Sequence, residues 1–508
     1  MCMMSPEIVE WYRVGGKMKI VVPRHSPHTP AMASTGVAKD RGTQRALPAP
    51  WVSSTNRETF MREYTYPTCG THPSYVPIQD ISRIVACGDF HGDYDAAVAC
   101  LRDCARVMNV RGGTSHAAPV YTWIAPPQTY VVILGDVVDR LRDTTQYQSP
   151  GEVPFEEIKV LDMINQLAQQ ATAAGSAVLR LLGNHEFFNL NGTFTYVTPY
   201  SLQTEFDGDP AKRGASFRTP HATYNSLLVA CNPKIAVQLG PFLFCHGGFT
   251  PKLVHTYAAL YYKAHNGSLE GINFLDYVNT MASNLINNVD VKEDSMYAKL
   301  KRAMFDGGGG DTLSVWTRTF GTHEQPYNPE TTKNLFLEFQ RAHPDNEPLK
   351  RLVVAHCTQF LRGWSHRTQQ LDDLVQTVED TALSTPTRIV YTSEPKRMAP
   401  GSLFGINFSR DFRVVRIDVG MSRSMDNSRE WPLLEQNNMA ETYCLARRPA
   451  ILNVTVENGS AKMQTIVARR PLFRDPTCNG EHHARFISTK RPTAWDAEHP
   501  SRQPHTLG

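Results

Sequence analysis

The chain has 508 residues, of which 41% are hydrophobic and 20% are charged, and its formal net charge is +3. This is an ordinary globular composition with enough apolar residues for a large core. The pI is about 8.3, and the Lys and Arg residues are scattered rather than clustered on one face, which argues against nucleic acid as a partner. No stretch approaches the roughly 20 apolar residues that cross a bilayer, so we expect no membrane partner.

The ten cysteines include no CxxC pair, so we do not expect a structural zinc knuckle. Several lie in apolar runs, such as the run that ends at Cys87, where a thiol behaves as a small hydrophobe. This usage indicates reduced thiols and favours a cytoplasmic protein. Residues 11–50 are rich in Arg, Lys, His, Ser and Thr and poor in acids, so an organellar transit peptide is the alternative.

Composition divides the chain into three parts. Residues 1–75 are rich in Pro, Ser, Thr, His and Arg and show little apolar periodicity, which predicts a disordered basic leader. Residues 471–508 have the same character and are expected to form a disordered tail. The region 76–470 shows the regular patterns of a single folded domain.

Strands and helices alternate in the first half of this region. The apolar run 81–88 predicts a strand, and apolar positions at Ala97, Leu101, Cys104 and Met108 predict the helix that follows it. The next expected elements are a strand buried on both faces, an amphipathic helix closed by Gly175, and another strand, at 130–134, 153–174 and 177–182. This order predicts a sheet with helices packed on it.

The second half is more strand-rich after a helical insert. Residues 250–345 are mainly helical by pattern, interrupted by the glycine run 307–310, which we interpret as a loop because it lacks the Lys-Ser/Thr of a phosphate loop. Two hairpins are expected, one around Gly240 and one around Asn458-Gly459, which is a strong turn signal. Further strands are expected at 352–355, 388–391, 404–408 and 412–419.

Five polar segments each follow a predicted strand directly. They are GDFHGD at 88–93, GDVVDR at 135–140, GNHE at 183–186, CHGG at 245–248 and AHC at 355–357. In open α/β sheets the loops at the carboxyl ends of the strands meet in one crevice, so these segments can gather around one site.

The residue types in these segments suit divalent cations. Carboxylate, amide oxygen and imidazole together favour Mn, Fe or Zn, and the absence of thiolate argues against a structural zinc site. Two ions about 3.5–4 Å apart would hold the attacking and leaving oxygens of a phosphoryl group in line, and a shared carboxylate would keep them that close. The set therefore predicts a two-metal phosphoryl-transfer site.

The order GDxHG, GDxxDR, GNHE, HGG and a strand-borne His resembles the calcineurin-like metallophosphoesterases. The forms GDFHGD, GDVVDR and GNHE are similar to those of the PPP-type serine/threonine protein phosphatases. The resemblance covers roughly residues 80–425 and implies an α/β (α+β sandwich) fold, with a central β-sandwich flanked by helices.

The resemblance also implies a role for each matching residue. The six metal ligands would be Asp89, His91, Asp136, Asn184, His246 and His356, with Asp136 bridging the two ions. His185, held by Asp139, would be the general acid to the leaving oxygen, and Arg140 would bind phosphate oxygens, for which an Arg fork is well suited. A water ionised by the ions would attack phosphorus in line, with inversion and without a phosphoenzyme.

Departures from the eukaryotic pattern point to one branch of that family. His356 lacks the second His of the GHxH motif found in many broader family members, which favours the PPP branch, but the SAPNYC-like segment of the eukaryotic phosphatases does not occur near the C-terminus. Residues 416–423, RIDVGMSR, resemble a stretch of the Shewanella-like phosphatases and their bacterial and viral relatives. Residues 315–318, VWTR, also resemble that branch. Arg318 is a candidate second phosphate-binding residue, whereas a structural role is favoured for Arg423.

The sequence leaves three functions open. The first is hydrolysis of phosphoserine or phosphothreonine in a phosphoprotein. The second is hydrolysis of a small phosphoester, such as a dinucleoside polyphosphate or nucleotide, on the same site. The third is a catalytically inactive scaffold, against which the presence of every expected ligand type argues. The segment 189–220 after GNHE is expected to shape the substrate groove.

Overall fold

The computed structural model describes the following residues: 10–14, 17–21, 74–112, 119–141, 156–218, 233–264, 274–276, 278–279, 315–320, 328–342, 344, 346–356, 389–390, 406–409, 413–422 and 449–468. Within these ranges two six-stranded sheets form the centre of the molecule. The glycine run 307–310 and Arg423 lie outside the described residues.

The first sheet has the order β12-β16-β15-β4-β7-β8. Its strands are β4 (Arg83–Cys87), β7 (Thr129–Ile133), β8 (Ala177–Arg180), β12 (Ile389–Val390), β15 (Ala450–Glu457) and β16 (Ser460–Val467). β4, β7 and β8 are parallel neighbours, so their carboxyl ends lie at the same edge. The apolar runs correctly predicted these three strands.

The second sheet has the order β13-β14-β11-β10-β9-β3. Its strands are β3 (Tyr75–Val76), β9 (Ala236–Leu239), β10 (Phe242–Cys245), β11 (Arg351–Val354), β13 (Asn407–Phe408) and β14 (Val414–Arg416). β10, β11 and β14 are parallel, and the predicted hairpin between β9 and β10 is confirmed. Gly240 has φ +54°, as its tight turn requires.

The two sheets share one apolar core. Val85 and Val131 of the first sheet belong to the same buried cluster as Phe244 and Val353 of the second. Burial of apolar side chains between sheets is the main stabilising term of such a sandwich. The predicted α/β fold with a central sandwich is confirmed.

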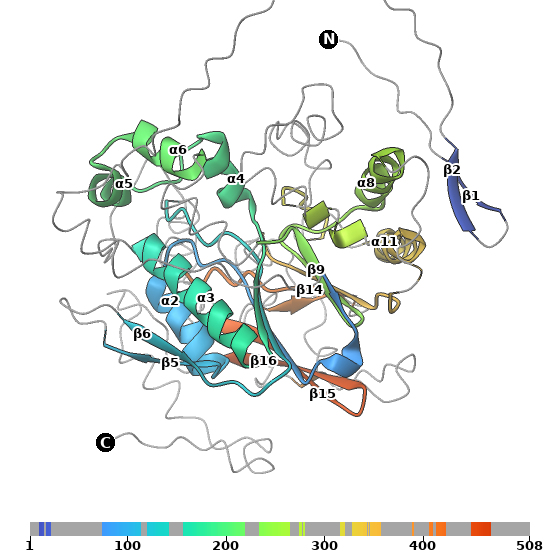
Figure 1. Ribbon diagram of the computed structural model, residues 1–508, viewed down its shortest axis with the longest axis horizontal. Helices are drawn as coiled ribbons and strands as arrows, with labels where there is room; N and C mark the ends of the chain where they lie inside the picture. Colours follow the sequence, from blue (N-terminus) through green and yellow to red (C-terminus); the bar gives the residue numbers. More distant parts are fainter. Residues whose placement is uncertain are drawn as a thin grey trace, which may run out of the picture.

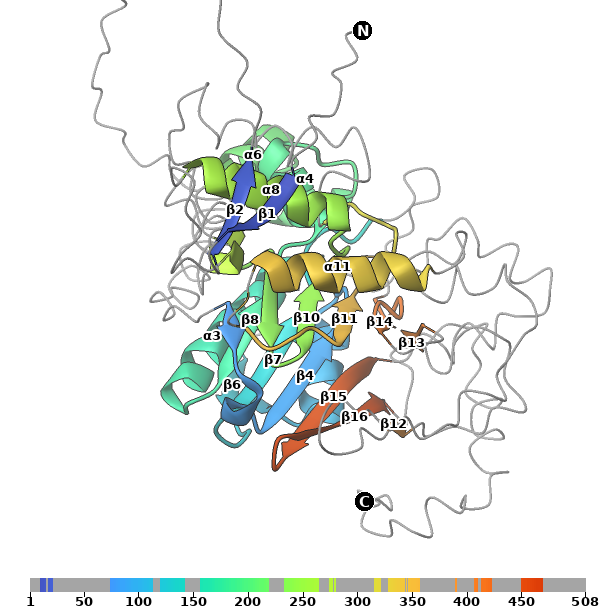
Figure 2. The ribbon, with the colours of Figure 1, turned by 90° about the vertical axis from the view of Figure 1, so that its right-hand side faces the viewer.

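Helices cover the outer faces (Figure 1). α2 (Tyr94–Val98), its π-helical continuation η2 (Ala99–Cys104) and α3 (Glu156–Ala173) lie beside the first sheet. α8 (Pro251–Ala264) and α11 (Pro329–Ala342) lie beside the second sheet, where a separate buried cluster joins them to it (Figure 2). The helical character expected for 250–345 is confirmed at these two helices.

Three short helices stand over the carboxyl ends of the strands. They are α4 (Asn184–Asn191), α5 (Pro199–Phe206) and α6 (Pro210–Arg218). Figure 1 shows them grouped on one side of the molecule, and α4 follows β8 directly along the chain.

The helix after β4 is shorter than the apolar spacing predicts. It ends at Cys104, and Met108 begins β5 (Met108–Arg111), which pairs with β6 (Val120–Trp123). Arg106 adopts a left-handed conformation with φ +53°, which cannot continue a right-handed helix. Met108 therefore fills the core from a strand, and the prediction that it lies on the helix is wrong.

The Asn458-Gly459 hairpin between β15 and β16 is confirmed. Both turn residues have positive φ, 52° and 73°, as a type I′ turn requires. A second hairpin, β1 (Glu10–Val14) with β2 (Lys17–Val21), lies inside the predicted leader. The division into leader, folded domain and tail stays a prediction. Among the described helices, none combines the length and the apolarity needed to cross a membrane.

Candidate metal centre and catalytic dyad

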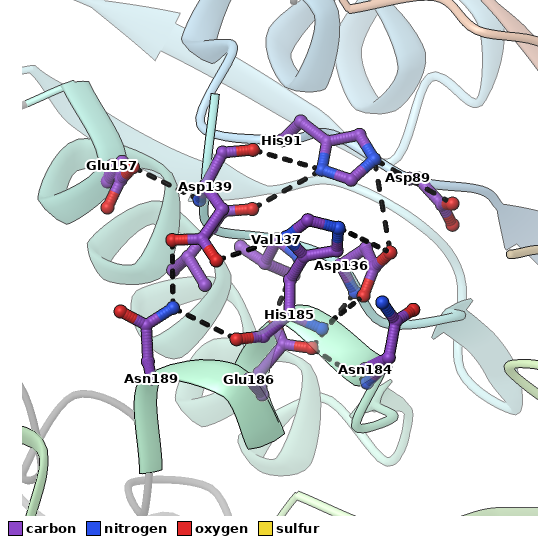
Figure 3. A network of polar contacts seen from close by, with 12 residues as sticks. Asp89, His91, Asp136, Val137, Asp139, Glu157, Asn184, His185, Glu186 and Asn189 are labelled. Carbon is purple, nitrogen blue, oxygen red and sulfur yellow. Dashed lines mark hydrogen bonds and ion pairs between the residues drawn. The ribbon is translucent and has the colours of Figure 1, made fainter. Parts of the chain in front are cut away.

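The residues that follow the parallel strands lie in sharp turns. Positive φ angles occur at His91 (45°), Asp136 (49°), Asp139 (67°) and His356 (63°). Residues other than glycine adopt this region rarely, and such strain concentrates at functional sites. Figure 3 shows the His91 and His185 rings directed toward the Asp136 carboxylate, whereas the Asp139 carboxylate faces His185.

Two glycines allow the turns after β7 and β8 to touch. A Cβ atom at Gly183 would lie 2.1 Å from Asp136 Oδ1, and one at Gly135 would lie 2.4 Å from the Gly183 nitrogen. The backbone N–H of His185 donates to Asp136 Oδ1 over 2.9 Å. The glycines of GDVVDR and GNHE are therefore needed to seat the Asp136 carboxylate.

Glu186 holds the same two turns together from below. Its Oε2 accepts from the N–H groups of Gly183 (2.7 Å) and Asp136 (3.0 Å), and its Oε1 accepts from that of Val137 (2.8 Å). Burial, together with the charge on Asp136, raises the pKa of Glu186. The sequence displayed this residue in GNHE, but reasoning from motifs assigned it no role.

One cluster of candidate metal ligands comprises His91, Asp136 and His185, whose ligand atoms lie within 4.8 Å of one another. His91 Nδ1 donates to the carbonyl oxygens of Asp139 (3.1 Å) and Val138 (3.4 Å), so the neutral ring has its lone pair on Nε2. This Nε2 lies 3.9 Å from a carboxylate oxygen of both Asp89 and Asp136. The expected first set, Asp89 with His91 and Asp136, is thus brought together.

The second cluster comprises Asp136, His246 and His356. His246 Nδ1 donates to the carbonyl oxygen of Leu134 over 2.6 Å, which leaves the Nε2 lone pair facing inward. That Nε2 lies 3.0 Å from Asn184 Oδ1, 3.2 Å from His356 Nδ1 and 3.3 Å from Asp136 Oδ2. The expected second set is also brought together, and Asp136 belongs to both.

The second cluster fits a cation. His246 Nε2, Asn184 Oδ1 and Asp136 Oδ2 are all electron-pair donors when neutral or anionic, and they converge where a proton or a metal ion must lie between them. His356 Nε2 is buried and has no hydrogen-bond partner among the described residues. A divalent ion would satisfy these atoms together.

The local charges agree with that assignment. Burial by itself would raise the pKa of Asp136, but the facing His246 and His185 rings bring it well below its usual range. Burial would lower the pKa of His246, whereas Asp136 raises it overall. Burial, His246 and Arg318 lower the pKa of His356. An ionised Asp136 and a neutral His356 are the ligand states that a metal ion requires, and His246 would likewise bind a metal through a neutral ring.

His185 and Asp139 form a dyad beside the clusters. His185 Nδ1 lies 3.0 Å from Asp139 Oδ2, and its Nε2 lies 3.8 Å from Asp136 Oδ2. A carboxylate on Nδ1 fixes the orientation of the ring, so Nε2 faces the site from which a proton would be donated. The pairing expected between these two residues is present.

Three buried residues that the sequence did not mark lie behind the dyad. Asn189 Nδ2 and Arg213 Nη2 donate to Asp139 Oδ1 over 2.8 Å and 3.1 Å, and Glu157 Oε1 accepts from the Asp139 N–H over 3.1 Å. No motif flagged them because they reach Asp139 from separate helices. The segment 189–220 thus supplies contacts to the dyad from behind.

The two predicted phosphate-binding arginines differ in their surroundings. Arg140 is buried, and its guanidinium forms an ion pair with Glu156 of α3. Arg318 is exposed, and its charge acts on His356. Binding of phosphate by either residue stays a prediction.

A β-sandwich with candidate divalent-ion ligands at the ends of its strands is typical of metal-dependent hydrolases. Comparison with known proteins points to the same class. The family described as calcineurin-like phosphoesterase matches residues 82–339. The chain belongs to this family, whose enzymes act on phosphoric ester bonds. The class of enzyme predicted from the five motifs is confirmed.

Two relatives carry the name of the branch that the sequence indicated. Shewanella-like protein phosphatase 1 of Plasmodium berghei is 29% identical over 166 residues, which are 33% of this chain and 39% of that protein. Shewanella-like protein phosphatase 2 of Arabidopsis thaliana is 31% identical over 121 residues, 24% of this chain and 25% of that protein. The chain thus spans well under half of these relatives.

Among solved structures, a cold-active protein-tyrosine phosphatase of a psychrophilic Shewanella species is similar to the chain at 15% identity and a TM-score of 0.39. That match covers 90% of this chain and 93% of the other.

Proposed function

We propose that the chain hydrolyses phosphomonoesters and that its substrate is phosphoserine or phosphothreonine in a protein. The proposed metal ligands are Asp89, His91, Asp136, Asn184, His246 and His356. The proposed catalytic residues are His185, Asp139, Arg140 and Arg318. The site would hold two divalent ions, with Mn, Fe or Zn as the candidates.

The position of Asp136 is the observation that carries this proposal. Its carboxylate belongs to both ligand clusters, and it lies 3.8 Å from the Nε2 atom of His185. A site that surrounds one carboxylate with two sets of ligands and a proton donor suits phosphoryl transfer, where charge on the phosphoryl oxygens and on the leaving oxygen must both be neutralised.

When bound, the divalent ions would supply positive charge to the phosphoryl oxygens and lower the pKa of a bound water. The chain's own part is to position and protonate. His185 would donate its Nε2 proton to the leaving alkoxide while Asp139 holds the Nδ1–H, so the ring ends neutral and the product leaves as an alcohol. Asp136, Asp139 and His185 are buried, and a buried setting strengthens each charge interaction.

The test combines metal analysis with a substrate panel. Purified protein should contain divalent metal, and with added Mn²⁺ it should release phosphate from phosphoserine and phosphothreonine peptides faster than from nucleotides or dinucleoside polyphosphates. Asp136→Asn should lose both bound metal and activity, whereas Asp103→Asn, at an exposed carboxylate paired with Arg102, should keep both.

Two results would change the assignment. Nucleotide turnover without peptide turnover would favour the small-phosphoester function. Wild-type protein that binds metal but turns over no phosphoester would leave the scaffold alternative in place.

A second substrate class, phosphotyrosine, is favoured by an aromatic cluster beside the proton donor. The His185 ring lies edge-on to Phe188 (5.5 Å between centroids) and Tyr196 (4.9 Å), and Phe188 contacts Trp316 at 4.7 Å. All three aromatic residues are half-buried, so part of each faces solvent. Such a surface could contact a phenol ring through offset or edge-to-face packing.

Phosphotyrosine peptides therefore belong in the same panel. Replacement of Trp316 by Leu should raise KM for phosphotyrosine more than for phosphoserine, if the phenol ring rests there. An equal effect on both substrates would remove the reason for this second candidate.

A further inference from the structure

Arg213 occupies an unusual place for an arginine. It lies on α6, within the segment 189–220, and its side chain has no exposed surface. A charged side chain is rarely buried to this extent unless it is paired on several sides. Its partners show what the segment does.

The Arg213 guanidinium bridges four polar groups. Nη2 donates to Asp139 Oδ1 (3.1 Å) and to Glu157 Oε2 (2.9 Å), Nε donates to Asn189 Oδ1 (2.7 Å), and Nη1 lies 3.9 Å from Glu205 Oε2. The guanidinium also lies 5.4 Å from the centre of the Phe206 ring. Three carboxylates around one cation exceed what simple charge neutralisation of a core requires.

The contacts meet on Asp139, the carboxylate that holds the proton donor. Its Oδ2 faces His185 Nδ1, while its Oδ1 accepts from both Asn189 and Arg213. Glu157, which is paired with Arg213, also accepts the backbone N–H of Asp139. The Asp139 carboxylate is therefore held by contacts from His185, Asn189 and Arg213, of which Figure 3 shows the first two, together with the contact of Glu157 to the Asp139 backbone.

We propose that Arg213 is a positioning residue for general acid catalysis, acting on His185 through Asp139. This inference rests on the proposed phosphomonoester hydrolysis and deepens it. Arg213 holds Oδ1 of Asp139, which leaves Oδ2 aimed at His185 Nδ1 and so directs His185 Nε2 into the site. The helical segment after GNHE therefore contributes Arg213 to the support of the general acid, in addition to its expected role in shaping the substrate groove.

The dependence of rate on the leaving group separates this role from a purely structural one. An alkyl ester such as phosphoserine needs its leaving oxygen protonated, whereas 2,4-dinitrophenyl phosphate leaves as a stable anion and needs little help. Arg213→Met should lower kcat for phosphoserine peptide by about 10- to 100-fold and kcat for the dinitrophenyl ester by less than about threefold. Arg213→Lys should recover part of the loss, because an ammonium supplies charge but not the planar fork.

Two controls complete the experiment. Asp139→Asn should reproduce the leaving-group dependence of Arg213→Met more strongly. Arg83→Met removes a partly buried arginine at the opposite end of β4, which donates to Asn453 (2.7 Å) and to the Ala105 carbonyl (2.8 Å), and should change stability alone. Thermal unfolding and metal content are measured for every variant, and Arg213→Lys decides the matter if Arg213→Met does not fold.

The outcomes distinguish the inference from the function on which it rests. An inactive wild-type protein refutes the proposed function. An active wild type in which Asp139→Asn shows leaving-group dependence, while the Arg213 variants slow both esters equally, refutes the role of Arg213 alone. Selective loss on the alkyl ester in both, with metal content unchanged, supports it.

Discussion

A single added methyl group at Gly183 should disable the site without unfolding the protein. Gly183 has φ −101°, which any residue can adopt, so alanine would introduce no backbone strain. Its Cβ atom would, however, lie 2.1 Å from Asp136 Oδ1 and 2.5 Å from the Asp136 nitrogen. Because ordinary contacts begin at 3.4 Å, the carboxylate or the turn must move by about 1 Å or more.

That displacement sets the expected magnitude. Misplacing a reacting group by about 1 Å can cost about 100-fold in rate, and disturbing the support of a metal ligand costs about 10- to 100-fold in metal affinity. We expect Gly183→Ala to lower kcat/KM for a phosphopeptide by about 100-fold or more. Excess Mn²⁺ should restore only part of this loss, since the added metal cannot return the carboxylate to its place.

The assay measures metal content, kcat/KM and thermal unfolding side by side with Gly459→Ala. Gly459 has φ +73° and nothing within 4 Å of its Cβ position, so alanine there should cost only about 1–2 kcal/mol of backbone strain and leave activity intact. If Gly183→Ala retains wild-type metal content and a rate within about threefold, the contact between Gly183 and Asp136 does not govern the site.

Three further outcomes are expected. Glu186→Gln should destabilise the fold by about 1–3 kcal/mol and weaken metal binding, because an amide nitrogen would then face one of the backbone N–H groups that now donate to Oε1 and Oε2. Equal unfolding midpoints in urea for the variant and the wild type would contradict this. Chelation followed by dialysis should abolish phosphatase activity, and Mn²⁺ should restore it; full activity in metal-free protein would refute the metal centre. Burial raises the pKa of Asp162 from 3.8 to about 8, so its contribution to stability is complete below about pH 4 and is lost as pH rises to about 8, by at most about 6 kcal/mol. Asp162→Asn should therefore gain stability relative to the wild type between these pH values, and urea unfolding at about pH 5 and about pH 8 that shows a constant difference would contradict the shift.

The fold was largely predictable because its central strands are buried on both faces. β7 (TYVVI) and β8 (AVLR) are mostly apolar, and a polar motif begins two or three residues after each strand ends. The pair β5 and β6 was not predicted because the apolar spacing from Ala97 to Met108 fits one continuous helix. The same spacing also fits a helix followed by a strand that places Met108 in the core. The left-handed backbone conformation of Arg106 ends the helix, and such a conformation does not change the apolar periodicity of the sequence.

The site was predictable to the extent that its residues follow strands within short segments. Asp136 and Asn184 were found because each occupies a motif, and parallel strands bring the motifs together. Arg213 was not found because its contact with Asp139 spans 74 positions and depends on how α6 packs. Neither spacing nor composition encodes such a contact, whereas the buried position of an arginine reveals it at once.

The structure also separates the part of each motif that folds from the part that reacts. Gly135, Gly183 and Glu186 build the turns, and a protein that served only as a scaffold would need them as much as an enzyme does. Such a protein would have no use for Asp136 and His356 together. Both lie in left-handed turns, Asp136 is buried and His356 is half-buried, and burying ionisable groups costs free energy unless a partner charge compensates it. A chain that keeps these unfavourable groups next to an intact His185–Asp139 dyad is better explained by an active metal centre than by an inactive scaffold.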